Sequence, residues 1–140
     1  MEEIDQILNE FSFLDDWEDK YQHLIDLGRE LKPLDEKFKN ETYKLKGCQS
    51  TVYFVTEDNS DGSVRFLANS DAFIVQGLIA LLLKVYSNKT PKKILETNTV
   101  FLQQIGLEAH LSPTRKNGLS AMLKKIKSEA HIRLKNNETQ

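Results

Sequence analysis

One segment in the middle of the chain would be apolar on nearly every side of a helix, and this limits where it can lie in a fold. Within residues 72–86 only Gln76, Gly77 and Lys84 interrupt a run of apolar side chains. A helix that is hydrophobic all round lies in the centre of a domain, and this one is too short to span a bilayer. We therefore expect a central helix, with Gly77 allowing a close approach to a sheet.

The sequence ahead of this helix has the pattern of β-strands. Residues 43–46 alternate between polar and apolar side chains, and residues 51–55 and 64–68 are rich in β-branched and aromatic residues. An Asp-Gly pair at residues 61–62 is a hairpin-turn signal. Because each connection is short, the three runs are expected to form an antiparallel meander. Cys48 then lies in the first connection, at the opposite end of the middle strand from the Asp-Gly turn.

Helical periodicity flanks these runs on both sides. The expected helices are residues 4–11, residues 17–28 with Asp15 or Asp16 as the cap and Pro33 as the stop, residues 91–95, residues 100–105 and a terminal helix begun by Ser112 and Pro113. The sequence therefore predicts an α+β fold, with a small three-stranded antiparallel sheet packed by several helices. We expect a single domain over residues 1–140, with its core from about 11 to 130 and frayed ends.

The charge is distributed unevenly along the chain. Residues 1–42 carry 13 acidic and 5 basic residues, whereas residues 111–140 carry 7 basic and 2 acidic residues. The bases are spread along an amphipathic helix, which favours a solvated face over nucleic-acid binding. The acidic start lacks the basic region of a signal peptide, and one unpaired cysteine suits a reducing compartment. We expect a cytoplasmic protein that binds neither nucleic acid nor membrane.

Cys48 is the only cysteine in the chain, so it forms no internal disulfide and supplies no multi-cysteine metal site. It is either a packing residue or a reactive one. A packing cysteine prefers apolar neighbours, but Gly47, Gln49 and Ser50 surround this one at a predicted turn. Gly47 permits the close approach of another backbone, and Gln49 and Ser50 offer hydrogen-bond donors to a thiolate or persulfide. The setting favours reactivity.

The other candidate groups do not complete an obvious catalytic site. The charges that could assist a Cys48 thiolate are Arg115, Lys46 and the start of the central helix at residues 70–71, and the sequence does not place any of them near the sulfur. His23, His110 and His131 have no metal-ligand spacing, and each is expected to be structural or exposed. No phosphate loop or dinucleotide fingerprint is present, so we expect no metal and no cofactor.

Four stretches, taken together and in order, resemble the SufE family of sulfur-acceptor proteins. They are WEDKY, LIDLG and LKPL within residues 17–34, KGCQSTVY at 46–53, NSDAFIVQGL at 69–78 and LSPTRKNGL at 111–119. The resemblance covers roughly residues 11–130. It implies the fold that this family shares with IscU-type cluster scaffolds; those scaffolds use three cysteines, so a chain with one is expected to relay sulfur and not to build clusters.

The resemblance implies a specific role for Cys48. In SufE-like proteins the matching cysteine takes persulfide sulfur from a SufS-type cysteine desulfurase, which uses pyridoxal phosphate, and passes it to the SufBCD scaffold for iron–sulfur cluster assembly. The acceptor also stimulates the desulfurase. By the same resemblance Gly47, Gln49 and Ser50 support the loop, and Asp71 and Arg115 support it or the docking surface; the alternative roles of the last two are a helix cap and a surface charge.

Other functions remain open at this point. Cys48 with His110 or His23 would suit a cysteine hydrolase, although no orienting Asn or Asp is evident. A plain interaction domain with an inert cysteine is a further alternative. Within the carrier interpretation, the desulfurase is of the SufS type or of the related CSD type, and a weak homodimer is a further partner to consider. We expect a sulfur carrier and desulfurase activator that is not itself an enzyme.

Overall fold

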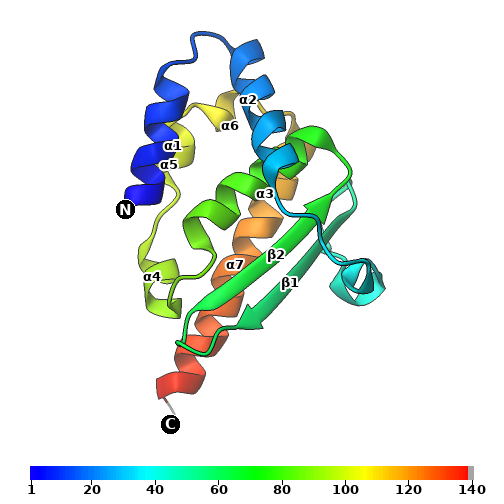
Figure 1. The fold of residues 1–140 in the computed structure, drawn as a ribbon, viewed down its shortest axis with the longest axis vertical. Coiled ribbons are helices and arrows are strands. Elements are labelled where there is room, and N and C mark those ends of the chain that lie inside the picture. Colours follow the sequence, from blue (N-terminus) through cyan, green and yellow to red (C-terminus); the bar gives the residue numbers. More distant parts are fainter. Residues whose placement is uncertain (139–140) are drawn as a thin grey trace.

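The computed structural model describes residues 1–138 and has an α+β fold, in which seven α-helices lie to one side of one β-hairpin (Figure 1). In chain order the elements are α1 (Glu2–Ser12), α2 (Trp17–Glu30), the 3-10 turns η1 (Glu36–Phe38) and η2 (Glu41–Tyr43), β1 (Val52–Asp58), β2 (Val64–Ser70), α3 (Phe73–Tyr86), α4 (Pro91–Glu96), α5 (Val100–Gln104), α6 (Leu107–His110) and α7 (Pro113–Glu138). The α+β class and the helices at both ends of the chain agree with the sequence.

The expected third strand does not form. The sheet has two antiparallel strands, β1 and β2, paired from Val52 with Ser70 to Asp58 with Val64. Residues 43–46 instead follow the turn η2 and make a single bridge, between Lys44 and Tyr53. Lys44 and Lys46 are exposed, and the alternating run is ended by Gly47, whose φ of +90° is outside the strand region. The prediction of a three-stranded sheet was therefore wrong in its first strand.

The hairpin turn lies where the sequence predicted it. Gly62 has a φ of +89°, and its N–H donates to the Asn59 carbonyl oxygen at 3.1 Å. The Asp61 carboxylate accepts hydrogen bonds from the N–H and hydroxyl of Ser63 at 2.9 and 2.6 Å. A glycine is the residue that adopts this backbone conformation without steric cost. The turn places the start of β1 and the end of β2 together at the far end of the hairpin (Figure 1).

Helix α3 is the central element, as its apolar circumference predicted. It contacts α1, α2, α7 and β2, and most of its side chains are buried. Gly77 does allow a close approach, but to α2 and not to the sheet. A methyl group at Gly77 would come within 2.6 Å of the Leu24 carbonyl carbon, and one at Gly28 would come within 2.8 Å of the Gly77 nitrogen. These two glycines let the backbones of α2 and α3 touch.

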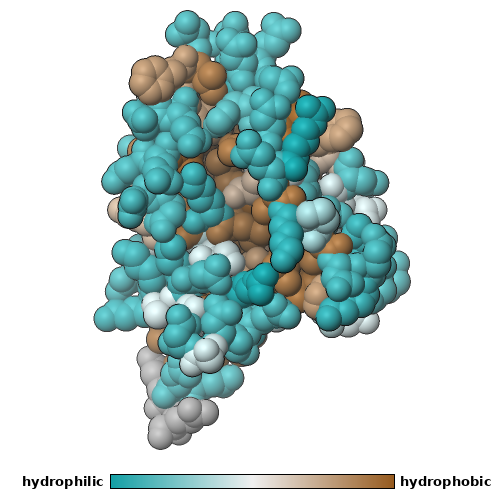
Figure 2. Space-filling model, viewed as in Figure 1, coloured by the Kyte–Doolittle hydropathy of each residue, from teal (hydrophilic) through white to brown (hydrophobic). Residues whose placement is uncertain are grey.

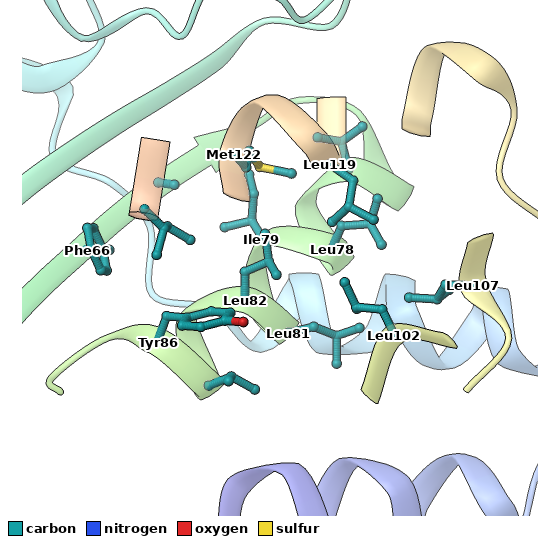
Figure 3. Packing of buried hydrophobic residues seen from close by; sticks show 14 of the residues in the cluster. Phe66, Leu78, Ile79, Leu81, Leu82, Tyr86, Leu102, Leu107, Leu119 and Met122 are labelled. Carbon is teal, nitrogen blue, oxygen red and sulfur yellow. The ribbon is translucent and has the colours of Figure 1, made fainter. Parts of the chain in front are cut away.

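The core joins α3 to the later helices (Figure 3). Figure 3 shows Leu78, Ile79, Leu82 and Tyr86 of α3 beside side chains of α5, α6 and α7. The buried hydrophobic residues of α7 are Leu119, Met122, Ile126 and Ala130, whereas Leu123 and Leu134 are half-buried. Packing also begins ahead of residue 11, because Ile7 of α1 is fully buried. Helix α7 continues to Glu138, so the C-terminal end that was expected to fray is helical as far as it is described, and residues 139–140 lie outside the described part of the chain.

Capping at two helix starts agrees with the sequence. The Asp16 side chain accepts from the Asp19 N–H at 2.9 Å at the start of α2, and the Ser112 hydroxyl accepts from the Arg115 N–H at 3.3 Å ahead of α7.

Hydrophilic residues cover most of the face in Figure 2, and hydrophobic residues gather near its middle. Within residues 1–138, none of the helices has the length and apolar character needed to cross a membrane.

Candidate functional site

Cys48 lies in the loop between η2 and β1, at the end of the hairpin where β2 also ends (Figure 1). Its side chain is partly buried against the first turns of α7. The Cys48 Sγ is 3.9 Å from the carbonyl oxygen of Gly118, a long and weak S–H···O contact. The thiol therefore lies on the boundary between the core and solvent, and it is neither fully exposed nor part of the interior.

The loop reaches this position through its glycine. Gly47 has a φ of +90°, and a methyl group at Gly47 would lie 3.6 Å from the Cβ of Ala121. Gly47 therefore lies close to Ala121, while Cys48 lies against Gly118 one turn earlier on the same helix. Small residues three apart on α7 thus form the surface on which the loop rests. Gly47, predicted as a loop-support residue, has a backbone conformation that other residues adopt only with strain.

The cavity beside the Cys48 thiol is small. It has a volume of about 10 Å³ and is lined by Cys48, Gln49, Ser50, Val52, Val75, Thr114, Arg115 and Gly118. A cavity needs roughly that volume to hold one water molecule. The structure thus brings together four residues predicted for the site: Cys48, Gln49, Ser50 and Arg115. The Thr114 hydroxyl donates to the Gln49 side-chain oxygen at 3.3 Å and links the loop to α7.

Partial burial raises the pKa of the Cys48 thiol above its usual value. The cause is desolvation, which disfavours the charged thiolate more than the neutral thiol. Arg115 lines the cavity, but desolvation still governs the shift. Since only the thiolate is nucleophilic, the thiol in this resting position is protected more than it is activated.

Asp71, expected to support the loop or the docking surface, lies outside the Cys48 cavity. It is exposed in the turn between β2 and α3. It is not the N-cap of α3 either, because that position is Ala72, which offers no side-chain cap. The Ser70 hydroxyl instead accepts from the Ala72 N–H at 3.2 Å. The prediction that residues 70–71 cap the central helix through a side chain was therefore wrong.

Lys46, the other basic side chain considered as a charge partner, is exposed. It lines a cleft of about 600 Å³ between the loop and α7, together with Lys44, Lys124 and Lys125. The Cys48 cavity does not include it. Of the two basic side chains proposed as thiolate partners, the structure thus brings only Arg115 to the cysteine.

The histidines do not approach the cysteine. His23 pairs with Glu10 at 3.2 Å and packs edge-on against Phe11. His110 ends the short helix α6, and its ring stacks on Trp17 with 3.9 Å between centroids. Neither ring lines the Cys48 cavity, so the pair that a cysteine hydrolase would need is not assembled in this conformation.

Within residues 1–138 no group of three or more His, Cys, Asp or Glu side chains could hold a metal ion. Sequence reasoning missed four residues that line the thiol cavity: Val52, Val75, Thr114 and Gly118. For Gly118 a signal was present. A glycine inside a long helix costs about 1 kcal/mol relative to alanine, which suggests that its lack of a side chain has a use.

Comparison with known proteins agrees with this arrangement. Residues 5–130 match the SufE family, described as an Fe-S metabolism associated domain. An uncharacterized SufE-like protein of Rhizobium meliloti is 41% identical over 138 residues, covering 96% of this chain and 99% of its own length. One of Rhizobium etli is 42% identical over 138 residues, covering 95% of this chain and 93% of its own length.

The fold also has a solved counterpart. The solution structure of a hypothetical protein from Thermus thermophilus superposes with a TM-score of 0.75 at 24% identity, and the match covers 95% of this chain and 96% of that one. This likeness concerns the fold alone. From the family match over residues 5–130 and the two relatives above 40% identity, we conclude that the chain belongs to the SufE family of sulfur acceptors in iron–sulfur cluster assembly.

Proposed function

We propose that Cys48 accepts sulfur from the persulfide of a SufS-type cysteine desulfurase, an enzyme that uses pyridoxal phosphate. The Cys48 thiolate attacks the outer sulfur of the donor persulfide, a new S–S bond forms at Cys48, and the donor's own S–S bond breaks. The donor cysteine leaves as a thiolate and takes up a proton, and the proton lost by Cys48 passes to solvent. No oxidant or reductant is consumed, because the transferred sulfur keeps its oxidation state as one S–S bond replaces another.

The observation that carries this proposal is the position of the Cys48 thiol on a glycine-hinged loop at the protein surface. The cavity beside Sγ, about 10 Å³, has no room for a donor persulfide. Transfer therefore requires the loop to leave α7 when the donor docks. Opening removes the desolvation that raises the thiol pKa, so exposure and activation occur in the same step.

The other residues of the site have supporting roles in this proposal. The Arg115 guanidinium, on the wall of the cavity, would stabilise negative charge on Cys48 as the thiolate forms. Gly47 allows the loop to turn, and Gln49 and Ser50 hold it to α7 or donate to the persulfide once it is loaded. Asp71 is exposed at the same end of the hairpin and would act through docking.

After loading, Cys48 would deliver sulfur to a SufBCD-type scaffold, and by removing the donor's persulfide the protein would stimulate the desulfurase. The protein then acts as a carrier with no cofactor of its own, in the cytoplasm where thiols stay reduced. A CSD-type desulfurase is the alternative donor. The chemistry at Cys48 would be the same, so direct comparison of the two enzymes distinguishes them.

The test is incubation with the desulfurase and cysteine, followed by mass spectrometry of the intact protein and its peptides. We expect a gain of about 32 Da, one sulfur atom, on the peptide that contains Cys48. The Cys48→Ser variant should neither gain this mass nor stimulate cysteine turnover. Absence of the modification in a mixture where the two proteins are shown to bind would reject the proposal, as would full stimulation by Cys48→Ser.

A further inference from the structure

An exposed aromatic ring lies beside the cysteine site. Phe73, the first residue of α3, has 66% of its surface exposed, and among the described large apolar residues only Phe13 is more exposed, at 77%. Phe73 lines a cleft of about 540 Å³ whose other walls include Ser50, Val75, Thr114 and Arg115. These four residues also line the Cys48 cavity, so the cleft and the cavity share a wall.

The surroundings of Phe73 are positively charged. The Arg29 guanidinium lies over its ring at 6.0 Å from the centroid, and Arg115 lines the same cleft. The first turn of α3 has no side-chain cap, so its N–H groups add partial positive charge there. Asp71 is the neighbouring carboxylate in sequence, and Arg29 has a long, exposed ion pair with Asp26 at 3.9 Å. Such an exposed pair is weak and leaves Arg29 open to another carboxylate.

We propose that Phe73 is the anchor by which the sulfur-donating enzyme docks, and that it enters an apolar socket rimmed by carboxylates on that enzyme. This inference rests on the sulfur-acceptor function proposed above. Buried aromatic and arginine side chains dominate the binding energy of protein interfaces. Here one aromatic ring, two arginines and the reactive thiol share a continuous surface, so docking at Phe73 would bring the donor persulfide to Cys48.

Phe13 provides a matched control. It is as large and more exposed, but it lies between α1 and α2 and lines neither the cleft nor the Cys48 cavity. We would measure the affinity of the desulfurase for wild type, Phe73→Ala and Phe13→Ala by calorimetry. Phe73→Ala is expected to weaken binding about tenfold or more, and Phe13→Ala to change it less than about twofold. Equal affinities for the three proteins would overturn the inference.

The contribution of the positive charge around Phe73 is tested separately. Arg29→Glu should weaken binding and reduce its dependence on salt, because it replaces an attraction to carboxylates by a repulsion. Lys92→Glu is the matched charge reversal, since Lys92 is exposed on α4 and lines neither cavity. If both reversals have the same effect, the binding responds to the net charge of the protein alone, and Arg29 has no specific role beside Phe73.

A small-molecule donor separates a docking defect from a chemical one. Cys48 can take sulfur from inorganic polysulfide: its thiolate attacks a terminal sulfur, an S–S bond breaks and a shorter polysulfide leaves. Phe73→Ala should load at the wild-type rate from polysulfide and slowly from the desulfurase. If wild type itself fails to load from the enzyme, the proposed function fails; if both proteins load equally from the enzyme, only the anchor fails.

Self-association is the remaining alternative for an exposed ring. Sedimentation of wild type and Phe73→Ala at the same concentrations measures it. A dimer that Phe73→Ala abolishes, together with an unchanged affinity for the desulfurase, would assign the ring to a second copy of this chain and overturn the inference. Because Phe73 is exposed, thermal unfolding of the variant should match wild type and show that any loss of binding is local.

Discussion

The Cys48 Sγ lies 3.9 Å from the Gly118 carbonyl oxygen, and a methyl group at Gly118 would lie 3.8 Å from the same sulfur. The second distance is an ordinary van der Waals contact, so a methyl group fits there, and the thiol occupies the space that a longer side chain at position 118 would enter. Residue 118 therefore sets how deeply the cysteine loop can lie against α7.

Substitutions at Gly118 should move the thiol in a graded way. Gly118→Ala fits beside Sγ and should stabilise α7 by up to about 1 kcal/mol through helix propensity. Gly118→Leu is too large for the cavity of about 10 Å³ and should displace the loop toward solvent. The rate of Cys48 alkylation by iodoacetamide should then rise several-fold in the Leu variant and stay near wild type in the Ala variant. Equal rates in both variants would show that Gly118 does not support the thiol.

The titration of Cys48 should follow its burial. Because desolvation raises the pKa of the folded thiol, the thiolate absorbance should develop at higher pH in the folded protein than in urea, where the thiol has a pKa of about 8.5. Burial of the neutral thiol therefore adds to the free energy of unfolding below the pKa of the unfolded thiol, and this contribution is lost as the pH rises through the pKa of the folded thiol. The Cys48→Ser variant, which has no thiol, gives the background absorbance at each pH. A folded pKa below the unfolded one would instead mean that Arg115 outweighs desolvation.

Gly77→Ala should destabilise the protein strongly, although alanine is the better helix former. The added methyl group would collide with the Leu24 backbone and come within 2.9 Å of the Leu24 Cβ, so α2 and α3 must separate. Overpacking of this kind costs about 1–3 kcal/mol, and more where backbone must shift. The control is Gly118→Ala, the same change in a helix where space is available. Urea unfolding of the two variants should shift in opposite directions; parallel shifts would contradict the packing described for α2 and α3.

Tyr86 should make stability depend on alkaline pH. Its hydroxyl donates to the Thr97 carbonyl at 3.0 Å, and burial raises its pKa to about 12. An unfolded tyrosine has a pKa of about 10, so the stabilisation is complete below pH 10 and is lost as pH rises toward 12.

The measurement is the difference in unfolding free energy between wild type and Tyr86→Phe. Below pH 10 the lost hydrogen bond should make the variant less stable by about 1 kcal/mol. Above pH 10 that difference should shrink. Lys127, whose Nζ lies 4.8 Å from the centre of the Tyr86 ring and whose pKa is lowered by desolvation, is present in both proteins, so its own titration largely cancels. A difference in unfolding free energy that is constant from pH 8 to 12 would contradict a raised pKa for Tyr86.

The elements that the sequence predicted best are those whose packing follows from their own pattern. The all-round apolar run gave the central helix α3, and the Asp-Gly pair gave the hairpin turn. Asp16 and Ser112 were recognised as caps because capping is local chemistry between residues three apart. The loop sequence and the family resemblance, which four short blocks carry, both singled out Cys48, and Arg115, named with it, lines the same cavity.

The errors arose where a long-range contact decided the outcome. Residues 43–46 alternate like a strand, yet the one bridge they make, from Lys44 to Tyr53, is too little to extend the sheet. Gly77 signals a close approach, but nothing local says that its partner is Gly28 of α2 and not a strand. Thr114 and Gly118 meet the cysteine across some seventy residues of chain, a separation over which periodicity carries no information.

The tight fit around the Cys48 thiol has a consequence for a carrier of sulfur. A second sulfur atom on Cys48 would take up the room of about one water molecule that the cavity of about 10 Å³ offers, so loading should weaken the packing of the loop against α7. Cargo and shape are then coupled, and the full and empty forms present different surfaces to the proteins they meet. A recipient that binds the displaced loop would bind molecules that carry sulfur in preference to those that do not. A molecule that has given up its sulfur would dissociate as its loop returns to α7.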